Sequence, residues 1–294
     1  MTDLLLTNEP WVRLAAFSGV FAAMAFWELW LPRRQPTIGR GRRWPANLGV
    51  VALDTLIVRI LFPAAAVGVA LACEARGWGL LNWLQAPLLI AVPVSVLLLD
   101  LAIYAQHAMF HHVPALWRLH RMHHADLDID VTTGLRFHPV EIVLSMLIKF
   151  AVVAALGAPA VAVLAFEVLL NATSLFNHSN VRMPPAVDGI VRWLVVTPDM
   201  HRVHHSIIRA ETDSNFGFNF PWWDHLFGTY RPEPREGHLG MTIGIEAFRN
   251  PAELRLDRML TQPFREDAGA RAGPRSVIPA NRSQDRQSSP TLRE

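Results

Sequence analysis

Five long hydrophobic runs constrain the fold of this 294-residue chain more than any other feature of its sequence. The first three are each long enough to cross a hydrocarbon core about 30 Å thick, which takes roughly 20 residues. The last two are shorter and fit a helical hairpin that is tilted or partly inserted. Because 51% of the residues are hydrophobic, we predict an all-α integral membrane protein, in which a multi-helix anchor carries one substantial polar region. The runs lie at residues 11–31, 48–73, 86–106, 140–156 and 159–176.

Charge bias predicts which side of the membrane the polar region faces. The first run contains Glu28 and ends without a small-residue cleavage site, so we expect a retained helix and not a signal peptide. The positive-inside rule places the arginine-rich loop after it in the cytoplasm. Successive crossings then bring every histidine cluster to the cytoplasmic side, which in a prokaryote means the inner membrane. The loop arginines are Arg33, Arg34, Arg40, Arg42 and Arg43.

Eleven of the thirteen histidines fall into five short stretches. On a helix, positions i, i+3 and i+4 share one face, so each HxxHH motif is predicted to aim three imidazoles at one point. The motifs offer more nitrogen donors than one four-coordinate zinc needs, and two nearby metal ions are the simplest interpretation. The stretches are HAMFHH at 107–112, HRMHH at 120–124, FHP at 137–139, NHSN at 177–180 and HRVHH at 201–205.

We predict metal ligation for nine of these histidines and leave one open. His112 has a different helical phase and is expected to face solvent. His138 precedes Pro139, so it is either a ligand or neighbour of a ligand, or simply the residue at which a helix begins. The predicted ligands are His107, His111, His120, His123, His124, His178, His201, His204 and His205.

Two acids are candidates for orienting the imidazoles. Asp100 shares a helical face with His107 and His111, and an acid at that depth in a membrane helix is expected to be functional. A carboxylate there can hold a ligating imidazole from behind. The alternative is an acid that snorkels or pairs two helices. Asp224, in an aromatic stretch, is a weaker candidate for accepting a hydrogen bond from a ligand.

Imidazole ligands suit Zn, Cu, Fe and Ni alike, so the setting must decide between them. No HExxH zinc-hydrolase motif occurs. Eight to ten imidazoles at a membrane surface fit two irons that activate O2 against a lipid chain, with apolar walls that exclude water. A metal transporter would instead place ligands at mid-membrane along a pore. A structural zinc protein would leave Asp100 and Glu167 unexplained.

The ordered set of motifs resembles the fatty acid hydroxylase superfamily, the sterol-desaturase-like integral membrane diiron oxygenases. The resemblance covers roughly residues 94–231 and implies a cytoplasmic helical metal cap, two iron ions and O2 as co-substrate. It implies hydroxylation or desaturation of a lipid such as a fatty acyl, sterol or ether lipid, and it carries the same nine ligands over to this chain. Some members have HxxxH where this chain has Ser174 to His178. The matching stretches are DLAIYAQHAMFH from residue 100, PALWRLHRMHH from 114, RFHP from 136, NHSN, HRVHH and residues 215–230.

The remaining expectations concern partners and boundaries. The chain has one cysteine, Cys73, and no GxGxxG motif or haem-binding HPGG, so electrons for O2 are expected from a separate protein. A net charge of +2 with dispersed arginines argues against a nucleic-acid partner. We divide the chain into transmembrane helices with the basic loop at 1–93, the hydroxylase-like catalytic domain at 94–231, a C-terminal extension at 232–263 and a disordered tail at 264–294.

Overall fold

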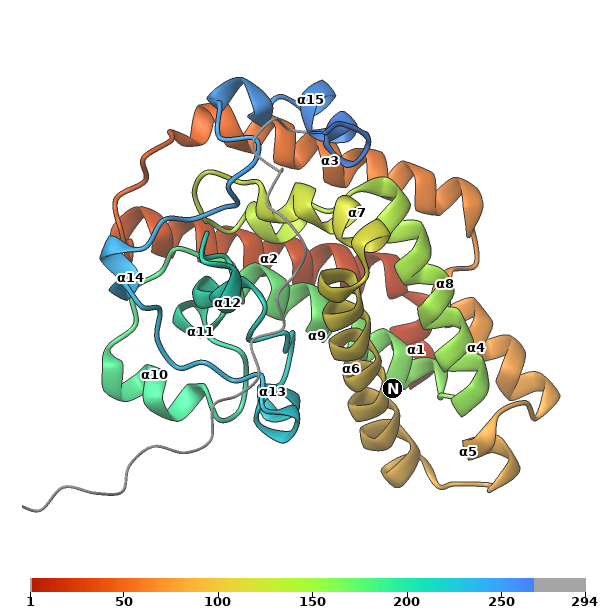
Figure 1. The fold of residues 1–294 in the computed structure, drawn as a ribbon. Coiled ribbons are helices and arrows are strands. Elements are labelled where there is room, and N and C mark those ends of the chain that lie inside the picture. The colour runs from red at the N-terminus through yellow and green to blue at the C-terminus, as the bar shows by residue number, and fades with distance from the viewer. Residues whose placement is uncertain (1, 267–294) are drawn as a thin grey trace, which may run out of the picture.

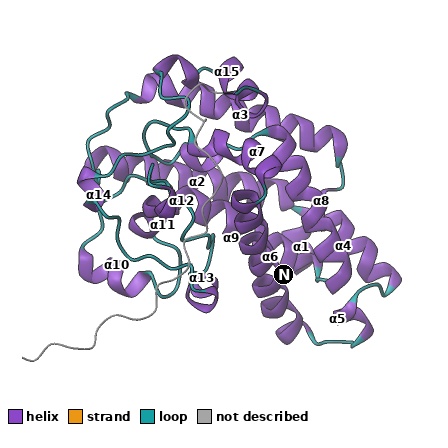
Figure 2. Ribbon diagram, in the orientation of Figure 1, coloured by secondary structure: helices purple, strands orange, loops and turns teal. Residues whose placement is uncertain are grey.

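The protein is built from helices joined by loops, as a computed structural model that describes residues 2–266 shows (Figure 1, Figure 2). Within that range no sheet forms, and the extended backbone is limited to two isolated bridges. Of the tail predicted at 264–294, residues 267–294 lie outside the described residues, whereas Phe264 ends a short 3-10 helix. The first half contains α1 (Thr2–Thr7), α2 (Glu9–Trp30), α3 (Arg40–Leu61), α4 (Ala65–Arg76), α5 (Leu80–Trp83), α6 (Leu88–His112), α7 (Pro114–His124) and η1 (Thr133–Leu135). The second half contains α8 (Pro139–Leu156), α9 (Ala160–Asn177), α10 (Pro185–Val191), α11 (Pro198–His204), α12 (Arg209–Thr212), α13 (Trp222–Phe227), α14 (Gly237–Gly240), η2 (Pro251–Leu254), α15 (Leu256–Thr261) and η3 (Gln262–Phe264).

Among the described residues, five segments are long and apolar enough to cross a membrane: α2, α6, α8, α9 and the stretch Arg40–Trp83. Only 6% of the apolar stretch of α2 is buried against the rest of the protein. The exposed apolar side chains of this helix therefore need lipid around them. In α9 the buried share is 56%, which makes it the central helix of the bundle. The prediction of an all-α integral membrane protein with a multi-helix anchor and a histidine-rich cap is confirmed.

The hydrophobic run at 48–73, predicted as one helix, is two helices. α3 ends at Leu61 and α4 begins at Ala65. Pro63 between them has no backbone N–H to continue a helical ladder, and Ala65 has a positive φ of 49°. Hydropathy alone does not register such a break, because the residues on both sides of it are equally apolar.

The core of the anchor lies where α4, α6, α8 and α9 meet. Small side chains from α4 pack against larger ones from α6 and α9, which allows the helix backbones to approach closely. This packing fixes the ends of α6 and α9, and both of these ends carry histidines. The buried cluster is Ala66, Val67, Ala70, Leu99, Ile103, Val153, Ala158, Ala160, Val163, Leu164 and Phe166.

Two buried charged residues attach the polar cap to the anchor. Glu28 near the end of α2 accepts backbone N–H bonds from Val131 and Asn180, both at 2.7 Å. Arg43 in α3 donates to Asp126 at 2.8 Å and to Asp130 at 2.5 Å. The loops that follow α7 and α9 are therefore held by side chains of the first two membrane helices.

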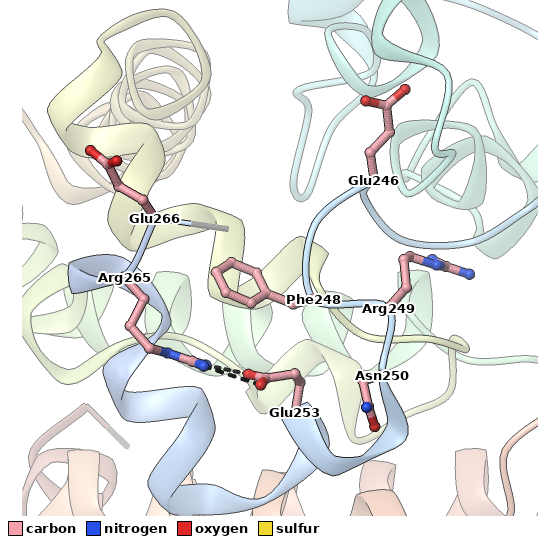
Figure 3. A pocket seen from close by; sticks show the side chains of 7 residues that line it. All are labelled: Glu246, Phe248, Arg249, Asn250, Glu253, Arg265 and Glu266. Atoms are coloured by element: carbon pink, nitrogen blue, oxygen red, sulfur yellow. Dashed lines mark hydrogen bonds and ion pairs between the residues drawn. The ribbon is translucent and has the colours of Figure 1, made fainter. Parts of the chain in front are cut away.

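The C-terminal segment lies over α3 and α7 (Figure 1). Arg121 of α7 donates to the carbonyl oxygens of Gln262 at 2.6 Å and Arg265 at 2.5 Å. A pocket of about 330 Å³ opens on this segment, and the Arg265–Glu253 ion pair crosses it (Figure 3). None of the predicted site histidines lines this pocket.

Candidate metal centre

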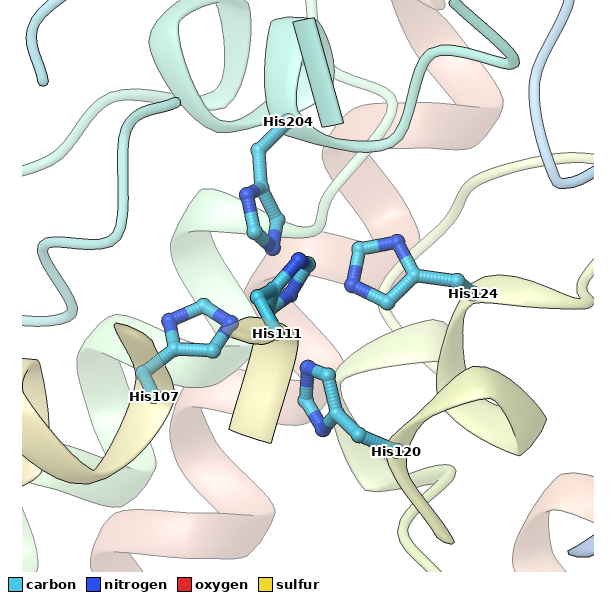
Figure 4. A group of neighbouring side chains, drawn as sticks. All are labelled: His107, His111, His120, His124 and His204. Carbon is cyan, nitrogen blue, oxygen red and sulfur yellow. The ribbon is translucent and has the colours of Figure 1, made fainter. Parts of the chain in front are cut away.

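Nine buried histidines meet inside the cap in two groups. Within each group every residue offers one ring nitrogen, and these nitrogens all lie within 4.8 Å of one another. Figure 4 shows the imidazoles of the larger group turned toward a common centre. The groups are adjacent, since the ring centroids of His124 and His205 lie 4.6 Å apart. The five-histidine group is His107, His111, His120, His124 and His204, and the four-histidine group is His123, His178, His201 and His205.

Each HxxHH motif is divided between the two groups, so the prediction that it aims three imidazoles at one point is wrong. In α7 the first and last histidines join the five-histidine group, and His123 joins the other. At α11 the assignment is reversed, and only His204 joins the five-histidine group. A helix turns about 100° per residue, so residues i+3 and i+4 lie on opposite sides of residue i, about 100° apart. A single helical turn therefore contributes histidines to both groups.

Backbone carbonyls fix three of the imidazoles from outside the groups. A carbonyl oxygen only accepts, so in each case Nδ1 carries the proton and Nε2 keeps its lone pair for the interior. This is the tautomer that a metal-binding imidazole needs. The bonds are His107 Nδ1 to Phe216 O at 2.9 Å, His178 Nδ1 to Ser174 O at 2.8 Å and His204 Nδ1 to Ser214 O at 2.7 Å.

Two carboxylates that the sequence analysis missed fix two further imidazoles. His120 Nδ1 lies 2.7 Å from Glu141 Oε1, and His111 Nδ1 lies 3.2 Å from Asp213 Oδ1. Glu141 had a detectable signal, because it is an acid on an apolar helix, the same argument that selected Asp100. Asp213 lies in a polar loop and had none.

The inward nitrogens fit metal ligation. In the five-histidine group, Nε2 of all five rings is buried without a hydrogen-bond partner among residues 2–266. In the four-histidine group, the Nε2 of His178 lies 3.1 Å from that of His123 and 3.0 Å from that of His201. His178 carries its proton on Nδ1, so its Nε2 has a single lone pair that cannot accept two well-aligned hydrogen bonds. Ligands about 2.1 Å from a shared ion, by contrast, have separations of this size. So many unpartnered buried nitrogens would be costly without such an ion.

Burial also keeps the imidazoles neutral, which is their ligating form. It lowers the pKa of His178 to about 3, and it lowers the pKa of five further cap histidines well below the ordinary value. Neighbouring imidazoles lower each pKa further, since a second positive charge in the same group is unfavourable. This applies to His123, His124, His201, His204 and His205.

The two acids predicted to orient ligands accept hydrogen bonds from an indole and from backbone N–H groups instead. Asp100 accepts from Trp223 Nε1 at 2.8 Å and has longer contacts to two backbone N–H groups, and it bonds no imidazole among the described residues. Asp224 accepts from the backbone N–H of Phe216 at 2.7 Å and of Gly217 at 2.8 Å. Since the carbonyl of Phe216 holds His107, Asp224 positions that imidazole indirectly.

His138 lies outside both groups. Its Nδ1 accepts from the N–H of Val140, and its Nε2 lies 3.2 Å from the carbonyl oxygen of Leu260. It is the residue before the first turn of α8, which is the second of the two alternatives that the sequence left open. His112 is exposed, and it too is outside the groups.

A cavity of about 380 Å³ lies beside the histidines, between membrane helices. Two of its aromatic lining residues contact imidazoles: Phe137 stacks on His123 with ring centroids 4.4 Å apart, and the ring centroid of Phe218 lies 6.2 Å from that of His178. Most other lining residues come from α3, α6, α8 and α9. The ring centroids of Phe137 and Phe218 also lie 6.1 Å from those of His120 and His107, respectively, so an apolar chain held in this cavity would end beside both histidine groups.

A helical membrane bundle with a cap of two buried histidine groups defines a class of membrane metalloprotein, and the sequence comparisons name its family. Residues 92–229 match the family model described as fatty acid hydroxylase. Residues 92–229 therefore form a fatty acid hydroxylase domain, as the motifs predicted. No solved structure was found to match it.

Three curated relatives illustrate the range of that family. Ornithine lipid hydroxylase OlsE of Rhizobium tropici is 30% identical over 54% of this chain and 47% of its own length. Alkylglycerol monooxygenase of Homo sapiens is 30% identical over 51% of this chain and 32% of its own. Very-long-chain aldehyde decarbonylase GL1-6 of Oryza sativa subsp. indica is 25% identical over 65% of this chain and 29% of its own length. This chain thus spans less than half the length of the curated relatives that it matches.

Proposed function

We propose that this protein is a diiron lipid hydroxylase, which uses O2 and external electrons to oxidise a C–H bond of a lipid. The observation that carries the proposal is the pair of adjacent histidine groups, whose anchored Nδ1 atoms leave inward nitrogens without partners. Five and four nitrogens are enough to hold one ion each. When bound, two irons supply the capacity to activate O2 with two electrons from a separate donor.

The residues around the groups have the tasks that this chemistry requires. Phe137 and Phe218 line the cavity and contact the imidazoles, so they hold an alkyl chain close to the groups and exclude water. The polar atoms behind the ligands, on Glu141 and the carbonyl of Phe216, keep the ligand tautomers fixed. Lipid enters from the bilayer, between helices whose outer faces are apolar.

The basic loop supports a cytoplasmic location for the site. Arg33 donates to Asp199 of α11 at 3.0 Å, and Arg34 donates to the carbonyl of Met241 at 2.8 Å. The loop after α2 therefore lies against the cap, on the same side of the membrane. The positive-inside rule assigns such a loop to the cytoplasm, where soluble electron donors are available.

The experiment that tests this function is growth under ¹⁸O₂ of cells that express the protein, followed by mass spectrometry of their lipids. We expect a lipid that gains one labelled oxygen with the wild type and is absent with His124→Ala or His205→Ala. A His112→Ala variant, outside both groups, is the matched control and should retain the product. Unlabelled product, or labelled product from both site variants, would refute the proposal.

A further inference from the structure

The cap has an exposed apolar surface on two short helices, α10 and α13. It lies on residues 182–194 and 221–230, where seven large apolar side chains are between 42% and 69% exposed. The rings of Trp193 and His225 stack with centroids 5.0 Å apart, and Trp222 Nε1 donates to the carbonyl oxygen of Trp193 at 2.7 Å. The two segments therefore form one continuous surface, which we call the apolar patch. Its members are Val187, Ile190, Trp193, Leu194, Trp222, Leu226 and Phe227.

The acids of these two segments are turned away from the apolar patch. Each segment contains one acid, and both acids are buried. Asp188 is held in an ion pair, and Asp224 accepts from backbone N–H groups of the preceding loop. The exposed ionisable residues of the two segments are Arg182 and His225. Exposed tryptophan and aliphatic side chains, with cations but no acids beside them, are typical of helices that lie in a membrane interface.

The contacts of α13 with α6 place the apolar patch at the level of lipid. Trp223 Nε1 donates to Asp100 at 2.8 Å, and Phe227 stacks on Tyr104 with ring centroids 5.3 Å apart. The apolar run of α6 ends beside His107, and Asp100 and Tyr104 precede this histidine by seven and three residues. They therefore lie about 10 and 5 Å inside the end of the run. Interfacial helices bury their apolar faces to a similar depth of about 5–10 Å. In Figure 1, α10 and α13 lie at the lower edge of the cap, level with α6.

We propose that α10 and α13 insert together into the leaflet on the side of the cap, as an interfacial element in addition to the membrane-spanning helices. Lipid is the occupant because the apolar patch continues the outer face of α6, which the bilayer already surrounds. A water-soluble partner could reach the patch only by displacing that lipid. The insertion is independent of the reaction that the metal centre catalyses.

The inserted helices are connected to the metal centre. Asp224 of α13 binds the backbone of Phe216, and the carbonyl oxygen of Phe216 holds the imidazole of His107. The cap is thus fixed to the bilayer on two sides of the histidine groups. The first two membrane helices hold it through Glu28 and Arg43, and the apolar patch holds it on the side of α6.

Spin labelling of the full chain tests the insertion, in nanodiscs of phosphatidylcholine and phosphatidylglycerol that are large enough for two copies. Cys73 is the single cysteine, so a Cys73→Ala background leaves one label per chain in Leu226→Cys or Ile190→Cys. Leu239→Cys is the matched control, because Leu239 is also a leucine of a short cap helix and, like Leu226, is 68% exposed. Its helix α14 lies beside the basic loop, since Arg34 donates to the carbonyl oxygen of Met241.

The measurement compares collisions of each label with molecular oxygen and with the polar complex nickel ethylenediaminediacetate. We expect the ratio of oxygen to nickel collisions at positions 226 and 190 to exceed that at 239 at least about tenfold, because hydrocarbon excludes polar complexes. Equal ratios at all three positions would overturn the proposal, since the apolar patch would then face water. Dipolar broadening between labels on two chains would overturn it as well, because a second copy would then cover the patch.

A second pair of variants tests the insertion without a label. Ile190→Glu should lower the melting temperature in nanodiscs by about 5 °C, because it places a carboxylate among acyl chains. Leu239→Glu is its control, since the two side chains are 69% and 68% exposed, and it should leave the melting temperature unchanged. Equal melting temperatures for the two variants would contradict insertion of α10.

Discussion

His178 Nε2 lies 3.0 Å from His201 Nε2, although the two residues come from different helices. Both atoms are imidazole nitrogens, so neither has a carbonyl or carboxylate oxygen as its partner in this contact. His123 Nε2 approaches the same atom from a third helix at 3.1 Å. In each ring, one nitrogen must act as an acceptor while the imidazole is neutral. Three such nitrogens at one point are explained by a cation between them. The metal centre, and the function proposed for it, depend on this convergence.

Single ligand replacements should remove metal from one group at a time. We expect His124→Ala to lower the iron content of the five-histidine group and His205→Ala that of the four-histidine group, each from about two irons per chain toward about one. Metal analysis of the purified variants checks this, with His112→Ala as the matched control. Full iron content in both variants would mean that neither residue is a ligand.

Replacing Gly134 by Ala should displace His178. A Cβ atom on Gly134 would lie 2.6 Å from the carbonyl oxygen of Ser174 and 3.1 Å from His178 Nδ1, and that carbonyl is the acceptor that fixes the imidazole. We expect a loss of stability of about 1–3 kcal/mol, typical of overpacking, together with weaker iron retention.

Gly189→Ala provides the control for this substitution. A Cβ there meets nothing within 4 Å, and Gly189 lies within α10, so Ala should leave stability unchanged or raise it by up to about 1 kcal/mol. Thermal unfolding and iron retention on dialysis measure both variants. If the two behave alike, Gly134 does not constrain His178.

Asp224→Asn should weaken the site through the backbone. The carboxylate accepts from two consecutive backbone N–H groups and from Thr229 Oγ1 at 2.7 Å, and an amide loses one of its two acceptor oxygens. We expect a destabilisation of about 1–3 kcal/mol and faster iron loss, because His107 depends on the carbonyl of Phe216. Asp257→Asn, on an exposed acid, should change neither quantity. A stable Asp224 variant that loses iron at the wild-type rate would contradict this positioning role.

Arg43→Gln should destabilise the whole cap. Arg43 is buried and pairs with Asp126 and Asp130, so its loss leaves two buried carboxylates without their main partner. Breaking such a buried network costs about 3–5 kcal/mol. The neighbouring Arg42 is exposed, and Arg42→Gln should cost less than about 1 kcal/mol. The melting temperatures of the two variants in detergent provide the comparison, and equal values would refute the structural role of Arg43.

The sequence predicted the helical membrane architecture because apolar runs report directly on burial in lipid. It did not predict the break near Pro63, because a proline in an apolar run can either kink a helix or end it. It also gave no indication that Glu28 and Arg43 would hold the cap loops, since their partners lie about a hundred positions further along the chain.

The histidines themselves were identifiable because repeated i, i+3, i+4 spacing is rare by chance. Their division into two groups was not, since spacing along one helix does not say where the neighbouring helices contribute. Asp100 and Asp224 were recognised as unusual acids, yet both bind the loop at 216–223 and not an imidazole. Which carboxylate meets which ring, as for Glu141 and His120, depends on tertiary packing.

The central claim is that two irons occupy the two histidine groups, and iron analysis with Mössbauer spectroscopy tests it most directly. Protein purified after growth on ⁵⁷Fe should contain about two irons per chain, magnetically coupled, and reduction followed by O2 should change their spectrum. Zinc alone, with no iron bound after anaerobic reconstitution, would contradict the diiron account.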